Sequence, residues 1–419
     1  MALAVIDIGS NVARSVVYSD NSICAREIYH ERFKVDLRSL LDNEDLSLKH
    51  PFYAVLNRFL DIFAKLEVKQ IKCVATAILR NHPKADKLCQ MLQEKYQINV
   101  EILTGQQEAF LSSCGLLMGS PNPNGIIADL GGGSLELAEV HSRKLNKMTS
   151  LPLGTQILSK IENLDQEYVI SKIKEAYCDY TKSDLYLIGG GFRIIAKSYI
   201  EHVSYPLYNI HNLEIPSAEL LNYLEHLQKN WLSVFTASRS NDMYSVIVLQ
   251  SLVEIFQPDK VLVSNYGLKE GIRYISLPQE ERYKDLIWER CKAFVGYQDG
   301  LIDMDSYTTV AQSILKTPQD SIDDVNYLIK LSLLLLQSKK NIDRNFHSHF
   351  VSHAVLMADI PFTHKQRASL ALIMSHVFGG KPNNYVQQLA LKVLRLPEYK
   401  TAMIIAKILS IALVLDGPV

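Results

Sequence analysis

Two segments of this sequence carry residues in an order that could bind an anion. In each of them an apolar strand runs into an aspartate, a turn of glycine or serine follows, and a second apolar strand begins. The first segment spans residues 4–18 and contains Asp7, and the second spans residues 125–140 and contains Asp129. Two such turns facing each other would clamp a phosphate group.

The turns hold the residue types that phosphate binding needs. Glycine allows the backbone to approach a ligand closely, and successive N–H groups in such a turn form a concave anion site. A hairpin also uses glycine for geometry alone, so one copy would be weak evidence, whereas two copies favour a binding function. The predicted phosphate-binding residues of the two turns are Gly9, Ser10, Asn11, Gly131, Gly132, Gly133 and Ser134.

The composition is that of an ordinary globular protein. The 419 residues suggest about two to four domains, and a formal net charge of −1 gives no overall positive field to attract DNA. No secretory signal is evident, and no membrane span is expected, because the apolar run at 331–336 is short and the run at 403–415 contains Lys407. Six scattered cysteines without a C-x-x-C pair predict reduced thiols and a cytoplasmic protein.

Strand and helix signals alternate up to about residue 280 and then give way to helices alone. We therefore predict an α/β lobe at 1–120, a second α/β lobe at 121–280 and an all-α domain at 281–419. The strands expected in the two lobes lie near 3–8, 14–18, 71–76, 98–103, 126–130, 135–140, 185–191 and 260–264. The helices expected there lie near 51–66, 84–96, 106–119, 166–182 and 192–198.

Several segments resemble, in order, motifs of the exopolyphosphatase and guanosine pentaphosphate phosphohydrolase (Ppx/GppA) family. Residues 7–14 are similar to its D-I-G-S-N-S-x-R motif, with Val12 in place of a serine. Residues 129–137 match D-I-G-G-G-S-T-E-L at all positions but one, if Leu130 counts as a conservative replacement. Further resemblances to A-T-S-A-L-R, S-G-x-E-E-A, S-L-P-L-G, G-G-T-x-R-x-x-A and V-S-x-x-G-L-R-E-G lie at 75–80, 104–109, 150–154, 189–196 and 264–271.

The resemblance implies a fold of two actin-like lobes with a cleft between them, followed by a helical HD-like domain. It also implies Mg²⁺-dependent hydrolysis of a terminal phosphoanhydride bond, with Glu108 as the general base that deprotonates the attacking water. Asp129 and Glu136 resemble the family's Mg²⁺-associated carboxylates, and Asp7 would contribute from the opposite side. On sequence alone, Glu108 could equally be a first-turn carboxylate favoured by the helix dipole, and Glu136 a solvent-facing strand residue.

Arginines and a second glycine pair complete the predicted phosphate site. Arg14 and Arg80 are predicted phosphate contacts, because guanidinium presents a fixed fork of donors, although either could be a surface arginine. Gly190 and Gly191 join this set through the resemblance, and Arg193, just after them, is a weaker candidate.

The helical domain departs from the HD pattern. His347 and His349 resemble the H-x-H-S stretch of HD-type phosphohydrolases, and His376 aligns with a later histidine. The place of the metal-binding His-Asp dyad is taken by Leu-Leu-Gln-Ser-Lys at 335–339. We therefore expect no hydrolytic centre there, so that these histidines and His353 pack or hydrogen-bond while the domain covers the site or supports a homodimer.

The sequence leaves the substrate and two other functions open. Inorganic polyphosphate and guanosine pentaphosphate both end in a phosphoanhydride. The near-neutral net charge slightly disfavours the long polymer as substrate, because binding of a polyanion usually rests on many cationic contacts. The replacement at Val12 and the missing dyad would also suit a regulatory protein that binds phosphorylated nucleotides without turnover. A kinase on the same fold is a third possibility, disfavoured by the motif at 104–109.

Overall fold

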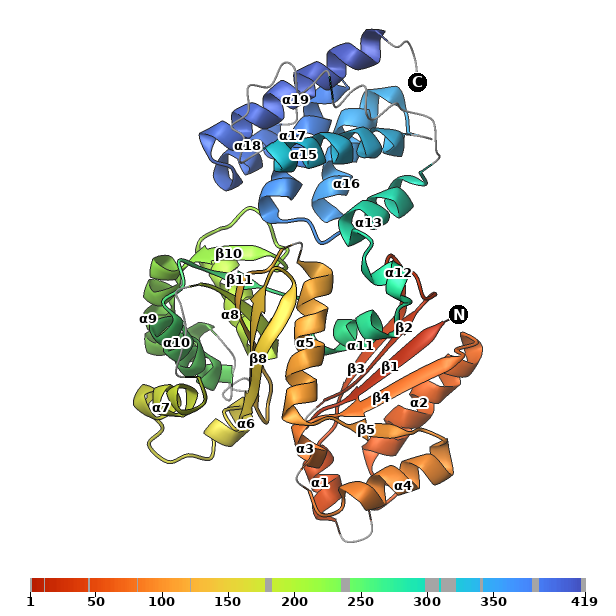
Figure 1. The fold of residues 1–419 in the computed structure, drawn as a ribbon, viewed down its shortest axis with the longest axis vertical. Coiled ribbons are helices and arrows are strands. Elements are labelled where there is room, and N and C mark those ends of the chain that lie inside the picture. Colours follow the sequence, from red (N-terminus) through yellow and green to blue (C-terminus); the bar gives the residue numbers. More distant parts are fainter. Residues whose placement is uncertain are drawn as a thin grey trace. The chain divides into compact units, whose positions relative to one another are not determined.

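The computed structural model describes residues 2–10, 12–43, 46–80, 82–120, 122–177, 183–234, 242–297, 309, 322–339, 342–378 and 384–415. The chain forms two compact units (Figure 1). Unit 1 comprises Met1–Tyr199 and Leu213–Lys284, and unit 2 comprises Ile200–Asn212 and Asp285–Val419. Residues 200–212 belong to the helical unit, although the sequence predicted them to be part of the second α/β lobe. The boundary predicted at 120/121 lies inside unit 1 and stays a prediction.

The first sheet of unit 1 has five strands and is largely that predicted for residues 1–120. In spatial order they are β3 (Glu27–Lys34), β2 (Val12–Tyr18), β1 (Leu3–Ile8), β4 (Gln70–Ala75) and β5 (Val100–Ile102). The antiparallel β1–β2–β3 meander continues into the parallel pairs β1–β4 and β4–β5. Strand β3 was not predicted, because its charged, mostly exposed residues lack apolar alternation.

The side chains on the two faces of β1 belong to two separate hydrophobic clusters. Ala4, Ile6 and Ile8 pack into a core with the helices that cover one face: α1 (Leu37–Asp42), α2 (Pro51–Lys65) and α4 (Ala85–Tyr96). Leu3 and Val5 belong to a separate cluster on the other face. Because side chains alternate along a strand, Asp7 lies on the face of Leu3 and Val5.

The second sheet has six strands. Their order is β10 (Leu213–Pro216), β11 (Lys260–Val263), β9 (Asp184–Gly189), β6 (Gly125–Leu130), β7 (Leu135–His141) and β8 (Lys144–Leu151). The predicted strand near 185–191 ends at Gly189, because Gly190 and Gly191 open helix α8 (Gly190–His202). The remaining helices of this part are α6 (Thr155–Leu158), α7 (Gln166–Ala176), α9 (Ser217–Val234) and α10 (Tyr244–Phe256).

Helix α5 (Gly105–Gly119) packs against both sheets and positions the site. Its residues are buried nearly all round, with Leu111 in the cluster beside β1 and with Leu116 and Leu117 in the cluster beside β6. Ile127 of β6 faces that second cluster, so Asp129, two residues later, lies on the same face. The fold thus turns both hairpin aspartates towards α5, with α3 (Ala77–Arg80) nearby and α11 (Leu268–Ser276) packed along it (Figure 1).

Glycines permit the close packing of α11 on α5. A Cβ at Gly115 would lie 2.1 Å from the carbonyl oxygen of Gly267, and one at Gly271 would lie 1.7 Å from that of Leu111. The two helices can approach this closely only without side chains at these positions. A short helix, α12 (Gln279–Arg282), ends unit 1.

Helices joined by loops make up the regular secondary structure in the described residues of unit 2. It contains α13 (Leu286–Val295), α15 (Ile322–Leu335), two 3-10 turns (Leu336–Lys339, Arg344–Phe346), α16 (His347–Met357), α17 (His364–Val377), α18 (Asn384–Val393) and α19 (Leu396–Leu415). Helix α17 is central, packed against α15, α16, α18 and α19. The two terminal nitrogens of the buried Arg367 guanidinium donate to the carbonyls of Val355, Ala358 and Ile360 inside the core. In the described ranges, we find no helix with the length and hydropathy needed for a membrane crossing.

Candidate active site

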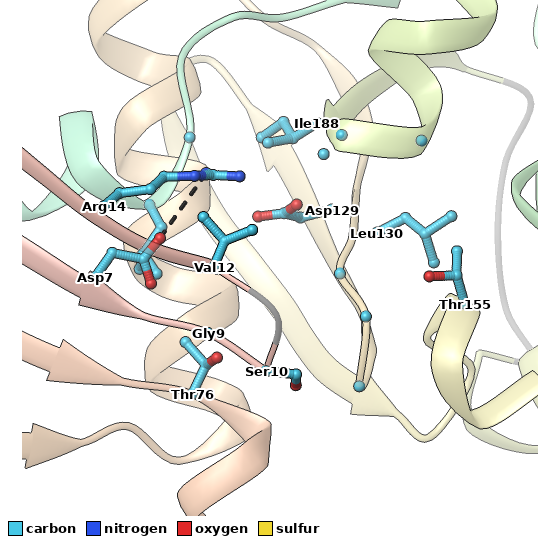
Figure 2. Close-up of a pocket in the computed structure, with 18 of the residues that line it drawn as sticks. Asp7, Gly9, Ser10, Val12, Arg14, Thr76, Asp129, Leu130, Thr155 and Ile188 are labelled. Atoms are coloured by element: carbon cyan, nitrogen blue, oxygen red, sulfur yellow. Dashed lines mark ion pairs between the residues drawn. The ribbon is translucent and has the colours of Figure 1, made fainter. Parts of the chain in front are cut away.

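The two hairpin turns close in the same way. The N–H of Gly9 donates to the carbonyl of Val12 at 2.9 Å, and the N–H of Gly131 donates to the carbonyl of Ser134 at 2.9 Å. The two hairpins, which are similar in sequence, therefore also share the hydrogen bond that closes the turn. Both turns line one pocket of about 860 Å³ in unit 1 (Figure 2).

The residues opposite the two aspartates differ in charge. Asp7 pairs across its hairpin with Arg14, and a guanidinium nitrogen of Arg14 lies 3.8 Å from the Asp7 carboxylate. Asp129 pairs across its hairpin with Glu136. One hairpin therefore carries an ion pair and the other a pair of acids, so the second has the greater need of a cation.

Most predicted site residues line this pocket. Those that do are Asp7, Gly9, Ser10, Arg14, Glu108, Asp129, Gly131, Gly132, Gly133, Ser134, Gly190 and Gly191. Arg80 and Glu136 are not among the lining residues, but each bonds to one of them, Arg80 to Glu108 and Glu136 to Ser134. Asn11 lies outside the described residues.

The turn at Gly131 presents its amides as an anion site would. The carbonyls of Gly131 and Gly132 accept from the first N–H groups of α6, those of Thr155 at 3.2 Å and Gln156 at 2.8 Å. Within the described part of the chain, the N–H groups of Gly132 and Gly133 have no protein acceptor. These two donors therefore remain available for phosphate oxygens.

Glu108 is fixed at the start of α5. Thr104 forms a capping box that fixes where the helix begins, and this places the buried Glu108 in the first turn. Arg80 donates to the Glu108 carboxylate and, through its Nε, to the carbonyl of Leu103 at 2.8 Å. Arg80 thus fixes the orientation of the Glu108 carboxylate, and the direct phosphate contact predicted for Arg80 stays a prediction.

Two serines hold the acids of the second hairpin. Ser112, one turn after Glu108 on α5, donates to the Asp129 carboxylate. Ser150 of β8 donates to the Glu136 carboxylate at 2.7 Å. Both bonds favour the ionised form of the acid that accepts them. Ser112 was missed from the sequence, although its i+4 spacing from Glu108 was a signal for it.

Burial and mutual repulsion raise the pKa of every acid in this cluster. Burial, followed by the charges of Glu136 and Asp129, raises the pKa of Glu108 to about 9 against the opposing effect of Arg80. Burial and the charge of Asp129 raise the pKa of Glu136 to about 7. Burial likewise raises the pKa of Asp129 and of Asp7. The ligand-free cluster therefore holds protons near neutral pH, and a bound cation would compete with them.

The carboxylates suit a hard cation that keeps most of its water. No group of three or more Asp, Glu, His or Cys side chains, within the ranges the structure describes, could hold a metal ion together. Oxygen donors from one or two carboxylates, completed by waters and substrate phosphate, are the usual protein site for Mg²⁺. Asp129 and Asp7, which both line the pocket, fit that kind of site.

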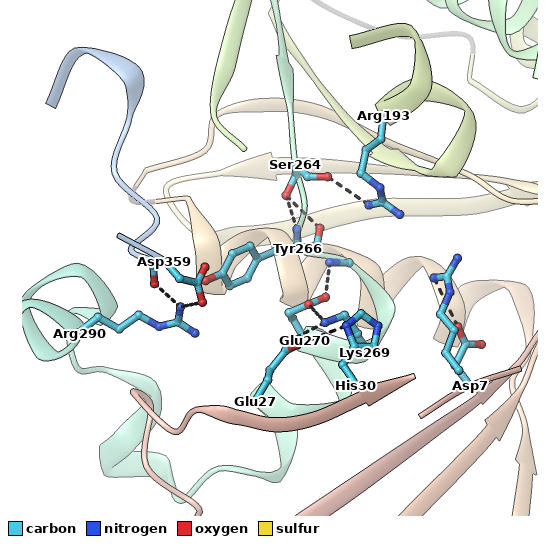
Figure 3. Close-up of polar contacts among 12 residues, drawn as sticks. Asp7, Glu27, His30, Arg193, Ser264, Tyr266, Lys269, Glu270, Arg290 and Asp359 are labelled. Atoms are coloured by element: carbon cyan, nitrogen blue, oxygen red, sulfur yellow. Dashed lines mark hydrogen bonds and ion pairs between the residues drawn. The ribbon is translucent and has the colours of Figure 1, made fainter. Parts of the chain in front are cut away.

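Residues of α11 and β3 also line the pocket and were not assigned a role from the sequence. Glu270 accepts from the N–H of Gly267 at 2.9 Å and lies 2.8 Å from Lys269, which also contacts Glu27 (Figure 3). These partners lower the pKa of Glu270 despite its burial. The family-like motif at 264–271 was the signal that pointed to this segment.

The candidate histidines of unit 2 are held by local hydrogen bonds. His347 contacts the carbonyl of Ile342 at 2.8 Å, and His353 contacts that of His349 at 2.8 Å. His376 lies 2.9 Å from the carbonyl of Leu372. These partly exposed histidines thus make hydrogen bonds to nearby backbone carbonyls, as was expected of them.

The geometry agrees with what comparison with known proteins shows. Residues 16–280, more than half of the chain, match the profile of the Ppx/GppA phosphatase family. This chain belongs to that family. Solved structures of an Aquifex aeolicus Ppx/GppA family member (TM-score 0.55, 19% identity, covering 65% of this chain and 96% of that one) and of a Cytophaga hutchinsonii exopolyphosphatase (TM-score 0.57, 17% identity, 66% and 97%) share its fold.

Two curated relatives differ in their coverage. Retrograde regulation protein 2 of Saccharomyces cerevisiae is 23% identical over 451 aligned residues, which cover 93% of this chain and 76% of that protein. The bifunctional 3-dehydroquinate synthase/phosphatase of Fusobacterium nucleatum is 23% identical over 62% of this chain, which spans only 44% of that protein. The relatives that this chain resembles therefore include one named for regulation and one named for catalysis.

Proposed function

We propose that this protein hydrolyses terminal phosphoanhydride bonds with the help of Mg²⁺, releasing phosphate from inorganic polyphosphate or guanosine pentaphosphate. The observation that carries the proposal is that Glu108, both hairpin turns and the start of α8 line one pocket. A phosphoryl group bound by the amides of Gly132 and Gly133 would lie among donors placed to offset its charge.

In the proposed reaction, one residue transfers a proton and the others position the reacting groups. Glu108 would accept the proton of the attacking water, while Arg80 holds its carboxylate in one orientation. Bound Mg²⁺ would supply positive charge that favours the ionised carboxylates and offsets charge on the phosphoryl oxygens. Ser112 and Ser150 fix the acids on which that charge would act.

The direct test is phosphate release by the wild-type protein and by Glu108→Gln, with polyphosphate and with guanosine pentaphosphate. The substitution keeps the size of the side chain and removes the proton acceptor, so we expect turnover to fall by about 10²–10⁴-fold. Glu101→Gln, at an exposed position on β5, is the matched control and should leave turnover unchanged. Equal rates for the wild type and Glu108→Gln would show that the assigned base is wrong.

A regulatory protein that binds phosphorylated nucleotides without turnover is the second candidate. Two observations favour it: the coverage of Retrograde regulation protein 2 over most of this chain, and Val12 in place of a hydroxyl-bearing residue in the first turn. Calorimetry with guanosine pentaphosphate beside the phosphate-release assay separates the two. Tight binding with no released phosphate would support the sensor. Cytoplasmic location and self-association stay predictions under either function.

A further inference from the structure

The start of helix α6 lies directly against the glycine turn of the second hairpin. Gln156, the second residue of this helix, lines the pocket together with Gly132, and its N–H donates to the carbonyl of Gly132 at 2.8 Å. A Cβ on Gly154, the residue that precedes the helix, would lie 2.3 Å from the carbonyl carbon of Gly133. These backbone contacts fix the position of Gln156 beside the turn (Figure 2).

The Gln156 side chain also lies against this turn. A Cβ on Gly132 would be 3.3 Å from the Cδ and 3.4 Å from the Nε2 of Gln156. In the part of the chain that the structure describes, the half-buried carboxamide has no hydrogen-bond partner in the protein. The N–H groups of Gly132 and Gly133 are without a protein acceptor in the same described residues. One turn of the pocket thus brings together two backbone donors and one side-chain donor that a ligand can engage.

Two other positions at the turns have lost a hydroxyl donor. Val12 and Ala77 line the pocket at positions where the similar Ppx/GppA motifs have serine. The methyl group of Ala77 lies next to Gly133, because a Cβ on Gly133 would be 2.6 Å from it. A methyl group donates no hydrogen bond, whereas a carboxamide offers two N–H donors. This chain therefore has a side-chain donor beside Gly132 and none at position 77 beside Gly133.

Packing alone gives no reason for a carboxamide at position 156. Burying part of an amide without a hydrogen-bond partner costs free energy, so an apolar side chain of the same size would pack against Gly132 more favourably. An anion at the turn would supply the missing acceptor, because the oxygens of a phosphate group can accept from several donors at once.

We propose that Gln156 is a substrate-contacting residue, whose Nε2 donates to an oxygen of the phosphate group bound by the amides of Gly132 and Gly133. This role rests on the proposed function, in which the reacting phosphate lies at the Gly131 turn. Because the carboxamide is uncharged, it adds a donor for the anion without forming an ion pair with the acids of the site.

The test is a calorimetric titration of the full chain with orthophosphate in the presence of Mg²⁺. The variants are Gln156→Met, which keeps the size of the side chain but removes the donor, and Gln156→Glu, which replaces the donor by a negative charge. The matched controls are Gln93→Met and Gln93→Glu, at an exposed position of α4. Thermal unfolding without ligand checks that each variant folds, and either Gln156 variant suffices if the other does not.

We expect Gln156→Met to bind orthophosphate about tenfold or more weakly than the wild type, because a hydrogen bond to a charged acceptor is lost. Gln156→Glu should bind more weakly still, because it places a like charge beside the anion. Both controls should stay within about twofold of the wild type.

A residue that only packs against the turn gives a different result. Both Gln156 variants keep the length of the side chain, so they would then bind orthophosphate like the wild type, and that result would overturn the contact. Any other order of the affinities among the folded variants, or no orthophosphate binding by the wild type, would overturn it as well. Failure of the proposed function alone is distinguishable, because the wild type would then bind orthophosphate through Gln156 but release no phosphate from either substrate.

Discussion

Replacing Gly105 by alanine tests whether close packing at the start of α5 sets the geometry of the acids. A Cβ at this position would lie 2.4 Å from the Cβ of Ser150, 2.8 Å from its Oγ and 3.3 Å from a guanidinium nitrogen of Arg80. Ser150 holds Glu136 and Arg80 holds Glu108. The added methyl group would therefore clash with Ser150 and crowd Arg80, the residues that bond to Glu136 and Glu108.

The steric effect should outweigh the gain in helix propensity. Alanine in place of glycine favours a helix by up to about 1 kcal/mol. Against this, overpacking costs about 1–3 kcal/mol, and a lost hydrogen bond to a charged group costs about 1.5–3 kcal/mol. Rotation of Ser150 cannot relieve the contact, because its Cβ is fixed to the backbone of β8. We therefore expect a net loss of stability of about 1–3 kcal/mol, or roughly 2–4 °C in Tm for each kcal/mol.

Gly190→Ala is the matched control for stability. Gly190 is also the first residue of its helix, but a Cβ there would meet no atom within 4 Å. Its Tm should be unchanged or slightly higher. In a phosphate-release assay, Gly105→Ala should lose about tenfold in kcat/KM, with its acid limb moved to higher pH, because Glu136 loses the Ser150 bond that lowers its pKa. A Gly105→Ala protein with wild-type Tm and wild-type turnover would refute this reasoning.

Three further predictions concern protons, the second hairpin and the first turn. Because the pKa values of Glu108 and Glu136 are raised in the folded protein, the contribution of these two acids to the unfolding free energy without metal is largest below about pH 4.5 and is lost as pH rises towards about 9. Mg²⁺ should reduce this loss, which denaturant titrations of the wild type and of Glu108→Gln at several pH values would measure. Ser112→Ala should raise the pKa of Asp129 and weaken Mg²⁺ binding by about 10–100-fold in calorimetry, and Ser112→Thr, which keeps the hydroxyl, should restore much of it. Val12→Ser should strengthen binding of orthophosphate a few-fold by adding a hydroxyl donor to the first turn, and unchanged affinity would show that position 12 does not reach the anion.

Local sequence was enough to predict much of the scaffold. The central strands β1, β4, β6 and β9 are apolar runs bounded by turn residues, which is why they were predictable. The outer strands β3 and β8 were missed because their exposed, charged residues lack that pattern. Membership of residues 200–212 in the helical unit was also missed, since that grouping comes from contacts with residues about 150 positions later, such as the bond from Asn212 to the carbonyl of Pro361.

The roles of individual site residues were predictable to different degrees. The aspartate–glycine turns and Glu108 were visible as motifs, because a turn that binds an anion needs a short run of particular residue types. The phosphate contact expected of Arg80 stays a prediction, whereas its bond to Glu108, a residue 28 positions away, was not predicted. A short sequence motif cannot indicate a contact between two residues so far apart in the chain.

The sequence by itself determined the two hairpin turns and the strands that carry them, because glycine geometry and strand periodicity are properties of neighbouring residues. The family was indicated by the resemblance of several motifs in order, and the family profile confirms it. Only the tertiary structure decided which acids share one buried site and which serines and arginines hold them. Those relations depend on α5 packing against both sheets, which joins residues far apart in the chain, and burial there is what raises the pKa of the acids.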